Sequence, residues 1–139
     1  MTNEELLQII EKAAREKATH LNLSDNKLRS LPPEISQLYN LRELFLANNK
    51  LSSLPPEICQ LSNLITLYLS NNELSSLPPE ISQLSKLEVL FLANNKLSSL
   101  PPEIGQLSNL TWLSLANNPQ LNSPPPEIVK QGAISKSWL

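Results

Sequence analysis

Residues able to carry out covalent or metal chemistry are scarce in this 139-residue chain, which contains one cysteine, Cys59, and one histidine, His20. Together they could form a nucleophile and its general base. Two such residues cannot supply the three or four ligands of a usual zinc site, so no metal site is expected. Whether the pair is catalytic depends on the elements that position the two side chains.

Nucleotide and nucleic-acid binding have little support in the composition. The only glycines are Gly105 and Gly132, too few for loops whose backbone N–H groups cradle nucleotide phosphates. The net charge is −2, from 11 basic and 13 acidic residues, which leaves no electrostatic footprint for nucleic acid or an anionic membrane. We expect no cofactor, no nucleic-acid or membrane partner and no small-molecule substrate.

The start of the chain, MTNEELLQII, carries acids where a signal peptide would carry positive charge. No later stretch approaches the ~18 apolar residues of a membrane span. A lone cysteine cannot form an internal disulfide, so nothing indicates an oxidising compartment. These features predict a cytoplasmic protein.

The chain contains an internal repeat with a fixed period of 23 residues. Its copies are LNLSDNKL from Leu21, LFLANNKL from Leu44, LYLSNNEL from Leu67, LFLANNKL from Leu90 and a divergent LSLANNPQL from Leu113. Such a period indicates one structural unit stacked repeatedly. We expect five units, at 21–43, 44–66, 67–89, 90–112 and 113–131.

Each unit combines a short strand with a return path. Leu44 and Leu46 alternate, as expected of a strand with both leucines on one face. One unit alone could not bury its leucines. Stacking buries them, because neighbouring strands lie about 4.8 Å apart and each leucine meets its counterpart 23 residues away.

One asparagine follows each predicted strand, where the chain turns inward. An inward amide must be hydrogen-bonded, and a column of them can satisfy backbone groups of adjacent turns. We therefore interpret the series as a structural ladder, formed by Asn26, Asn49, Asn72, Asn95 and Asn118.

Proline pairs such as Pro55-Pro56 cannot donate sheet hydrogen bonds and belong on the outer, convex side. The glutamate after each pair suits the first turn of a short helical segment. A calcium-binding acidic ladder is the functional alternative, but one carboxylate per turn makes a poor site. The glutamates are Glu34, Glu57, Glu80 and Glu103.

The pattern LxxLxLxxNxLxxLPPEIxxLxxL resembles the leucine-rich repeat family, in particular its cytoplasmic 23-residue LPxxI class. The resemblance extends from about Leu21 to Ile128. It implies an α/β fold, a right-handed solenoid of five repeats with a parallel β-sheet on the concave side. Similar repeats occur in Ras-suppressor-like and Scribble-like adaptors and before Roc GTPase domains in bacteria. Copies this similar also indicate recent duplication or a consensus design.

In such a solenoid the Cys–His pair is separated. His20 precedes the first strand on the concave side, whereas Cys59 lies in the convex return of the second repeat, at a slot that elsewhere holds serine or glycine. We therefore expect no enzymatic activity, with Cys59 a bystander thiol and His20 a rim residue.

The residues between the strand leucines point onto the concave face and stack in columns. The central column includes three consecutive aromatics that we expect to be exposed, and the preceding column extends this apolar stripe. Such a patch predicts a protein-binding site. Rings that only stabilise cross-strand pairs are the alternative. The predicted contact residues are Phe45, Tyr68, Phe91, Trp112, Val89, Glu43 and Thr66.

On the rim of this face, Lys27, Lys50, Glu73 and Lys96 form a column of mixed sign. Its simplest interpretation is a surface ion-pair ladder worth roughly 0–1 kcal/mol per pair. A role in recognising charges on a partner is the alternative.

Both ends depart from the repeat. Residues 1–20 predict an N-terminal capping helix over 2–18, with Thr2 and Glu5 as a capping box and Leu6, Ile10 and Ala13 on one face. Residues 132–139 predict a tail or incomplete cap. If that cap is inadequate, a homodimer through the open C-terminal edge is expected.

The sequence thus favours a non-catalytic module that binds a protein or peptide on its concave face. Two alternatives stay open. One is the recognition segment of a larger signalling protein, either a Roc-type GTPase or an effector enzyme. The other is a structural or designed solenoid without a natural ligand.

Overall fold

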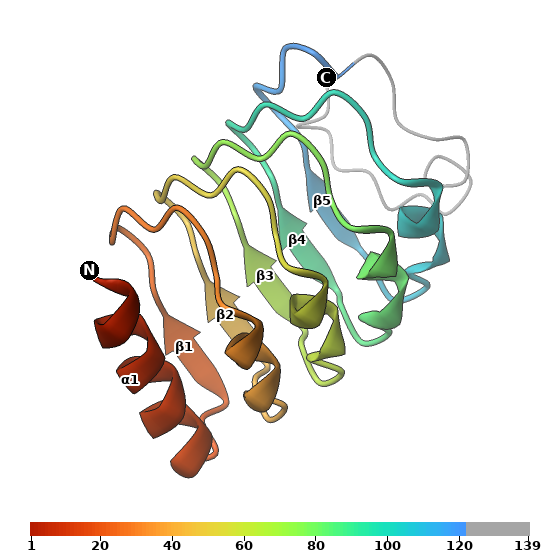
Figure 1. Cartoon of the computed structure of the whole chain (residues 1–139). Coiled ribbons are helices and arrows are strands. Elements are labelled where there is room, and N and C mark those ends of the chain that lie inside the picture. The colour runs from red at the N-terminus through yellow and green to blue at the C-terminus, as the bar shows by residue number, and fades with distance from the viewer. Residues whose placement is uncertain (122–139) are drawn as a thin grey trace.

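The computed structural model describes residues 1–121, which form a curved stack of coils with one parallel sheet. The five strands lie in chain order from β1 to β5 (Figure 1). Their bounds are β1 His20–Asn22, β2 Glu43–Phe45, β3 Thr66–Tyr68, β4 Val89–Phe91 and β5 Trp112–Ser114.

The register confirms the 23-residue period. His20 pairs with Glu43, Leu44 with Leu67, and the same offset holds through β5. Each strand therefore adds one coil without a shift, and every side chain of the sheet has a counterpart directly alongside it in the next coil. The predicted architecture, an α/β solenoid of stacked coils with one parallel sheet, is confirmed.

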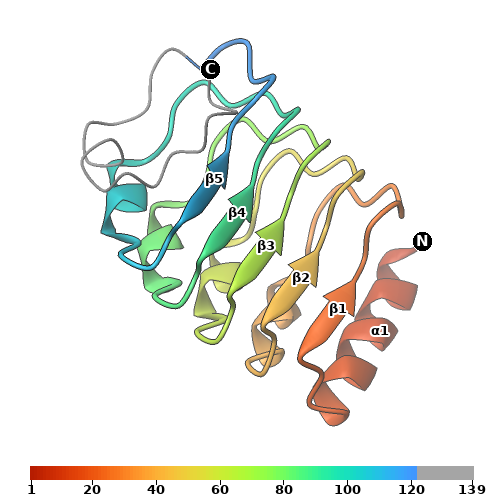
Figure 2. The same ribbon diagram turned by 180° about the vertical axis from the view of Figure 1, so that it is seen from behind.

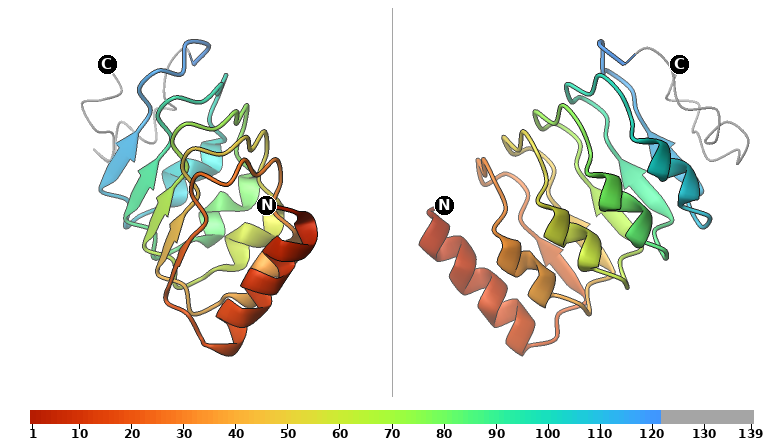
Figure 3. Two further views of the ribbon diagram at one scale, coloured as in Figure 1. Left: turned by 90° about the vertical axis from the view of Figure 1, so that its left-hand side faces the viewer. Right: turned by 45° about the vertical axis from the view of Figure 1, so that its right-hand side comes forward.

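Short 3₁₀ helices cover the inner face of the sheet and form the convex side (Figure 3). Each begins at the second proline of its pair, because proline has a helical φ and lacks an N–H that would need a partner. The glutamate follows in the first turn, as predicted. Their bounds are η1 Pro33–Gln37, η2 Pro56–Gln60, η3 Pro79–Gln83 and η4 Pro102–Gln106.

The core lies between the sheet and the 3₁₀ helices. Leu44, Leu46, Ile58, Leu61 and Leu64 of a single coil are all completely buried. The same set recurs in the neighbouring coils, so the core is continuous along the solenoid axis. Stacking supplies the burial that one coil lacks.

Helix α1, Asn3–Arg15, packs against the first coil and covers the N-terminal end of the stack (Figure 1). Thr2 Oγ1 accepts from Glu5 N–H at 3.1 Å, as predicted. Leu6, Ile10 and Ala13 are its buried residues.

The helix ends earlier than the 2–18 range expected from sequence. Ala18 N–H donates to Ala13 O and Lys17 N–H to Ala14 O, the bonding pattern of a Schellman C-cap. Lys17 has a φ of 52°, a conformation that normally favours glycine. This turn redirects the chain into β1.

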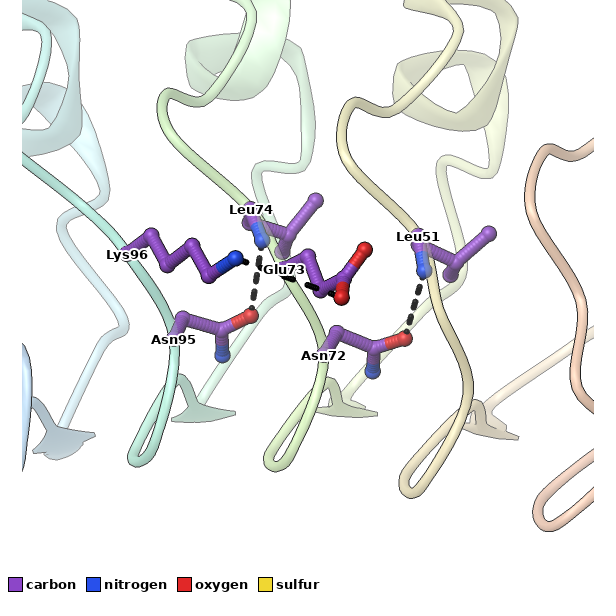
Figure 4. Close-up of polar contacts among 6 residues, drawn as sticks. All are labelled: Leu51, Asn72, Glu73, Leu74, Asn95 and Lys96. Atoms are coloured by element: carbon purple, nitrogen blue, oxygen red, sulfur yellow. Dashed lines mark hydrogen bonds and ion pairs between the residues drawn. The ribbon is translucent and has the colours of Figure 1, made fainter.

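The predicted asparagine ladder is confirmed. Leu51 N–H donates to Asn72 Oδ1 at 3.0 Å, and Leu74 N–H donates to Asn95 Oδ1 at 3.0 Å (Figure 4). The residue before each asparagine of the ladder has a positive φ. In the third coil this residue is Asn71, with a φ of 59°. The first residue of each pair thus makes the turn, a role that the repeat pattern alone did not predict.

The end of the fifth repeat, the tail at 132–139 and the edge of the expected homodimer lie outside the described residues. Within 1–121, no helix is long and apolar enough to cross a membrane.

Candidate protein-binding face

The outer face of the sheet carries the predicted aromatic residues and is not crossed by any element of residues 1–121 (Figure 2). Phe45, Tyr68 and Phe91 occupy equivalent positions of β2, β3 and β4. Their rings stack with centroids 4.5 Å apart between Phe45 and Tyr68 and 4.9 Å apart between Tyr68 and Phe91. We call these three residues the aromatic ladder.

The ladder differs from the prediction in its exposure. The three side chains are half-buried rather than exposed. Adjacent ring planes lie within 6° and 9° of parallel, so each ring covers its neighbour's face and turns its edge outward. The ladder is therefore a ridge of ring edges, because the strand spacing nearly equals the stacking distance.

Both ends of the ladder adjoin residues without a ring. Asn22 pairs with Phe45 in register, and Ser114 pairs with Phe91. Asn22 Oδ1 accepts from Ser24 N–H at 2.9 Å, so its amide is engaged in its own coil.

Trp112 is the most accessible aromatic residue of this face, with 46% of its surface exposed. It pairs in register with Val89, which is half-buried, and Val89 pairs with Thr66. Thr66 is only 9% exposed, so it contributes little contact area. Of the predicted binding residues, Trp112 and Val89 thus present the apolar surface beside the ladder.

Glu43 and His20 form a polar cluster at the N-terminal end of the same column. His20 Nε2 lies 2.8 Å from Glu43 Oε1, and His20 Nδ1 lies 2.8 Å from Thr19 Oγ1. His20 was expected to precede the first strand, but it is the first residue of β1.

Cys59 lies in η2, inside the convex side, and is only 1% exposed. Burial, reinforced by the nearby Glu80 carboxylate, raises the pKa of the Cys59 thiol from 9.0 to about 12. A thiol that stays protonated and covered is a poor nucleophile. Since His20 bonds to Glu43 and Thr19 on the outer face, the structure does not bring the Cys–His pair together.

The residues described contain no group of three or more His, Cys, Asp or Glu side chains that could hold a metal ion. On the rim, Lys96 Nζ lies 4.0 Å from Glu73 Oε1 (Figure 4). Lys50 makes no ion pair within residues 1–121, so the predicted alternating ladder is reduced to one pair.

Comparisons with known proteins agree with this architecture. The leucine rich repeat family matches residues 16–74 and 62–119, and a second leucine rich repeat family matches residues 109–130. A search of curated proteins gave no match, whereas 265 chains of solved structures match.

One of these structures is a leucine-rich repeat protein of Leptospira interrogans, similar with a TM-score of 0.67 and 42% sequence identity. The alignment covers 90% of this chain and 38% of the Leptospira chain, so the present chain corresponds to less than half of that protein. With family matches that span most of its length, this chain belongs to the leucine-rich repeat family.

Proposed function

We propose that this chain is a non-catalytic module that binds a protein or peptide on the outer, concave face of its sheet. The proposal depends on one observation: an uncovered face carries an apolar ridge, the aromatic ladder, next to the exposed Trp112. Exposed aromatic clusters are frequent centres of protein interfaces.

The geometry favours contact along the ridge rather than insertion between rings. Each internal ring face is already covered by its neighbour, so a partner meets ring edges. The column on the other side of the ladder consists of small residues that leave space for side chains of a partner: Ser24, Ala47, Ser70, Ala93 and Ala116.

Within this face we assign different weights to the predicted residues. Trp112 and Val89 are the proposed apolar anchors at the β5 end, and the ladder supplies the centre. Glu43 offers a charged contact at the β1 end, although its bond to His20 must compete with any partner. Thr66 acts as a spacer.

The test is affinity capture from native cytosol with the wild type and with the variant F45A/Y68A/F91A/W112A. The specific partner should be lost while the circular dichroism spectrum stays similar. Tyr39→Ala is the matched control, because Tyr39 is 58% exposed but lies in the turn after η1. Equal capture by the quadruple variant contradicts the proposal and favours a solenoid without a ligand on this face.

A second candidate is the recognition segment of a larger signalling protein, a Roc-type GTPase or an effector enzyme. The greater length of the Leptospira protein supports keeping this candidate. In either case we assign the repeats to the LPxxI class of cytoplasmic, Ras-suppressor-like or Scribble-like adaptors. Finding a Roc-like domain downstream in the same reading frame would decide between the two candidates.

A further inference from the structure

A polar pocket of about 400 Å³ lies at the edge of the solenoid where the turns enter the strands. This edge is the lower one in Figure 1. We call this cavity the edge pocket. It spans successive coils and is lined by Thr19, Asn40, Arg42, Asn63, Ile65 and Lys86.

Lys86 departs from the repeat at a position where the repeat has a structural asparagine. Asn63 Nδ2 donates to Tyr39 O and Asn109 Nδ2 donates to Ser85 O, each at 2.8 Å across neighbouring coils. Lys86 stands at the equivalent position between them, and its Nζ instead donates to Asn63 Oδ1 at 3.0 Å. The ammonium group is thereby held over the coil that contains Asn63.

Arg42 lines the same pocket and immediately precedes β2. It lies one repeat before Ile65, so the two residues belong to adjacent coils, whose strands are about 4.8 Å apart. The Arg42 guanidinium has no ion-pair partner within 4.0 Å among residues 1–121, and neither has Lys86. Ile65 also lines the pocket, and its side chain offers neither cation a hydrogen-bond acceptor.

The absence of acids from this lining distinguishes it from a second cationic pocket. That pocket, of about 290 Å³, is lined by Arg29, Lys50, Ser52 and Glu73, so a carboxylate already faces its cations. Near the edge pocket, Glu43 is engaged by His20, and Glu88 does not line the cavity.

From this geometry we infer that the edge pocket binds a phosphate monoester, carried by a side chain of a protein partner or by a free small molecule. A guanidinium can bond two oxygens at once, and charge-assisted bonds are the stronger ones. The Lys86 ammonium, which gives one of its three hydrogens to Asn63, and the Asn40 amide supply further donors. A dianion with three oxygens uses this set better than a singly charged carboxylate.

The test is a titration of the ¹⁵N-labelled chain with inorganic phosphate at constant ionic strength, followed by NMR. Saturable shifts are expected at the amides of Asn40, Asn63 and Lys86. The variant R42Q/K86Q should weaken binding by roughly tenfold or more, because each charged bond contributes substantially. The matched control R29Q/K50Q removes the same charge and should leave affinity unchanged.

Three results would overturn the inference: no saturable shift, equal affinity in R42Q/K86Q, or equal affinity for acetate. Binding of phosphoserine should also strengthen from pH 5.5 to 7.5, because the monoester loses its second proton near pH ~6. Comparing phosphoserine with a short phosphoserine peptide identifies the source, since tighter binding of the peptide indicates a partner side chain. These readouts do not involve the aromatic ladder and are independent of the proposed function.

Discussion

The side-chain Nδ2 of Asn72 donates to the carbonyl oxygen of Leu46, 2.9 Å away and 26 residues earlier in the chain. The same amide also donates to Leu69 O at 3.1 Å, and its Oδ1 accepts from Leu51 N–H. One buried side chain therefore satisfies three backbone groups in two consecutive coils. Within residues 1–121, Leu51 N–H has no other partner, whereas Leu46 O also accepts from Asn49 Nδ2 and Leu69 O also accepts from Asn95 Nδ2.

Replacing Asn72 with alanine should lower the free energy of unfolding by about 1–3 kcal/mol. This is the cost of leaving one buried backbone group unsatisfied, because Leu51 N–H loses its partner while Leu46 O keeps its bond from Asn49 and Leu69 O keeps its bond from Asn95. Urea denaturation measures the change. A loss below about 1 kcal/mol would show that the asparagine ladder is dispensable.

Its neighbour provides the contrast, because Asn71 is exposed and has a φ of 59°. Asn71→Gly should be nearly neutral, since glycine adopts this conformation without strain. Asn71→Val should destabilise the protein, because a β-branched residue is a true outlier there. The two adjacent asparagines thus have separable roles in one turn.

Leu69→Ala should cost about 2–5 kcal/mol through the cavity left in the core. Leu69 is completely buried, whereas Ser75, in the following loop, is exposed. Ser75→Ala is therefore a suitable control and should change stability by less than about 0.5 kcal/mol. Thermal unfolding of both variants checks this, and an unchanged midpoint for Leu69→Ala would contradict the register.

The stability of the wild type should fall in alkaline solution because of Cys59. Its pKa is about 12 in the folded state and 9.0 ordinarily, so the unfolded chain loses the proton first as the pH rises. The contribution is therefore fully present below pH 9 and is lost between pH 9 and about 12. Each pKa unit corresponds to about 1.4 kcal/mol.

Cys59→Ser isolates this effect, since Ser36 and Ser82 occupy the same slot in other repeats. Urea denaturation at pH 8 and pH 11 should show a larger loss of stability in the wild type than in the variant. Equal losses in the two proteins would mean that other groups account for the alkaline sensitivity.

The backbone plan of the molecule was predictable because it repeats. The 23-residue offset gave the strand register, and the inward asparagines gave the ladder between coils. Both depend on where each Cα lies, and equal spacing in the sequence determines that once coils stack.

The parts that were not predictable depend on side-chain direction. The rings of the aromatic ladder are half-buried because their faces cover one another. Equivalent positions in successive repeats do not by themselves indicate this burial. The edge pocket depends on Lys86 reaching Asn63 Oδ1, a choice among many rotamers of a long side chain. Its one signal in the sequence is a lysine where neighbouring repeats have asparagine.

The aromatic ladder makes a quantitative prediction about coupling between its members. Tyr68 stacks on two rings, whereas Phe45 and Phe91 each stack on one. A double-mutant cycle between Phe45 and Tyr68 should therefore give a coupling energy of about 0.5–1.5 kcal/mol, and the cycle between Phe45 and Phe91 a value near zero. Denaturation of the alanine variants supplies the data. Strong coupling between the two phenylalanines would mean that the strands beneath, and not the ring contacts, transmit the effect.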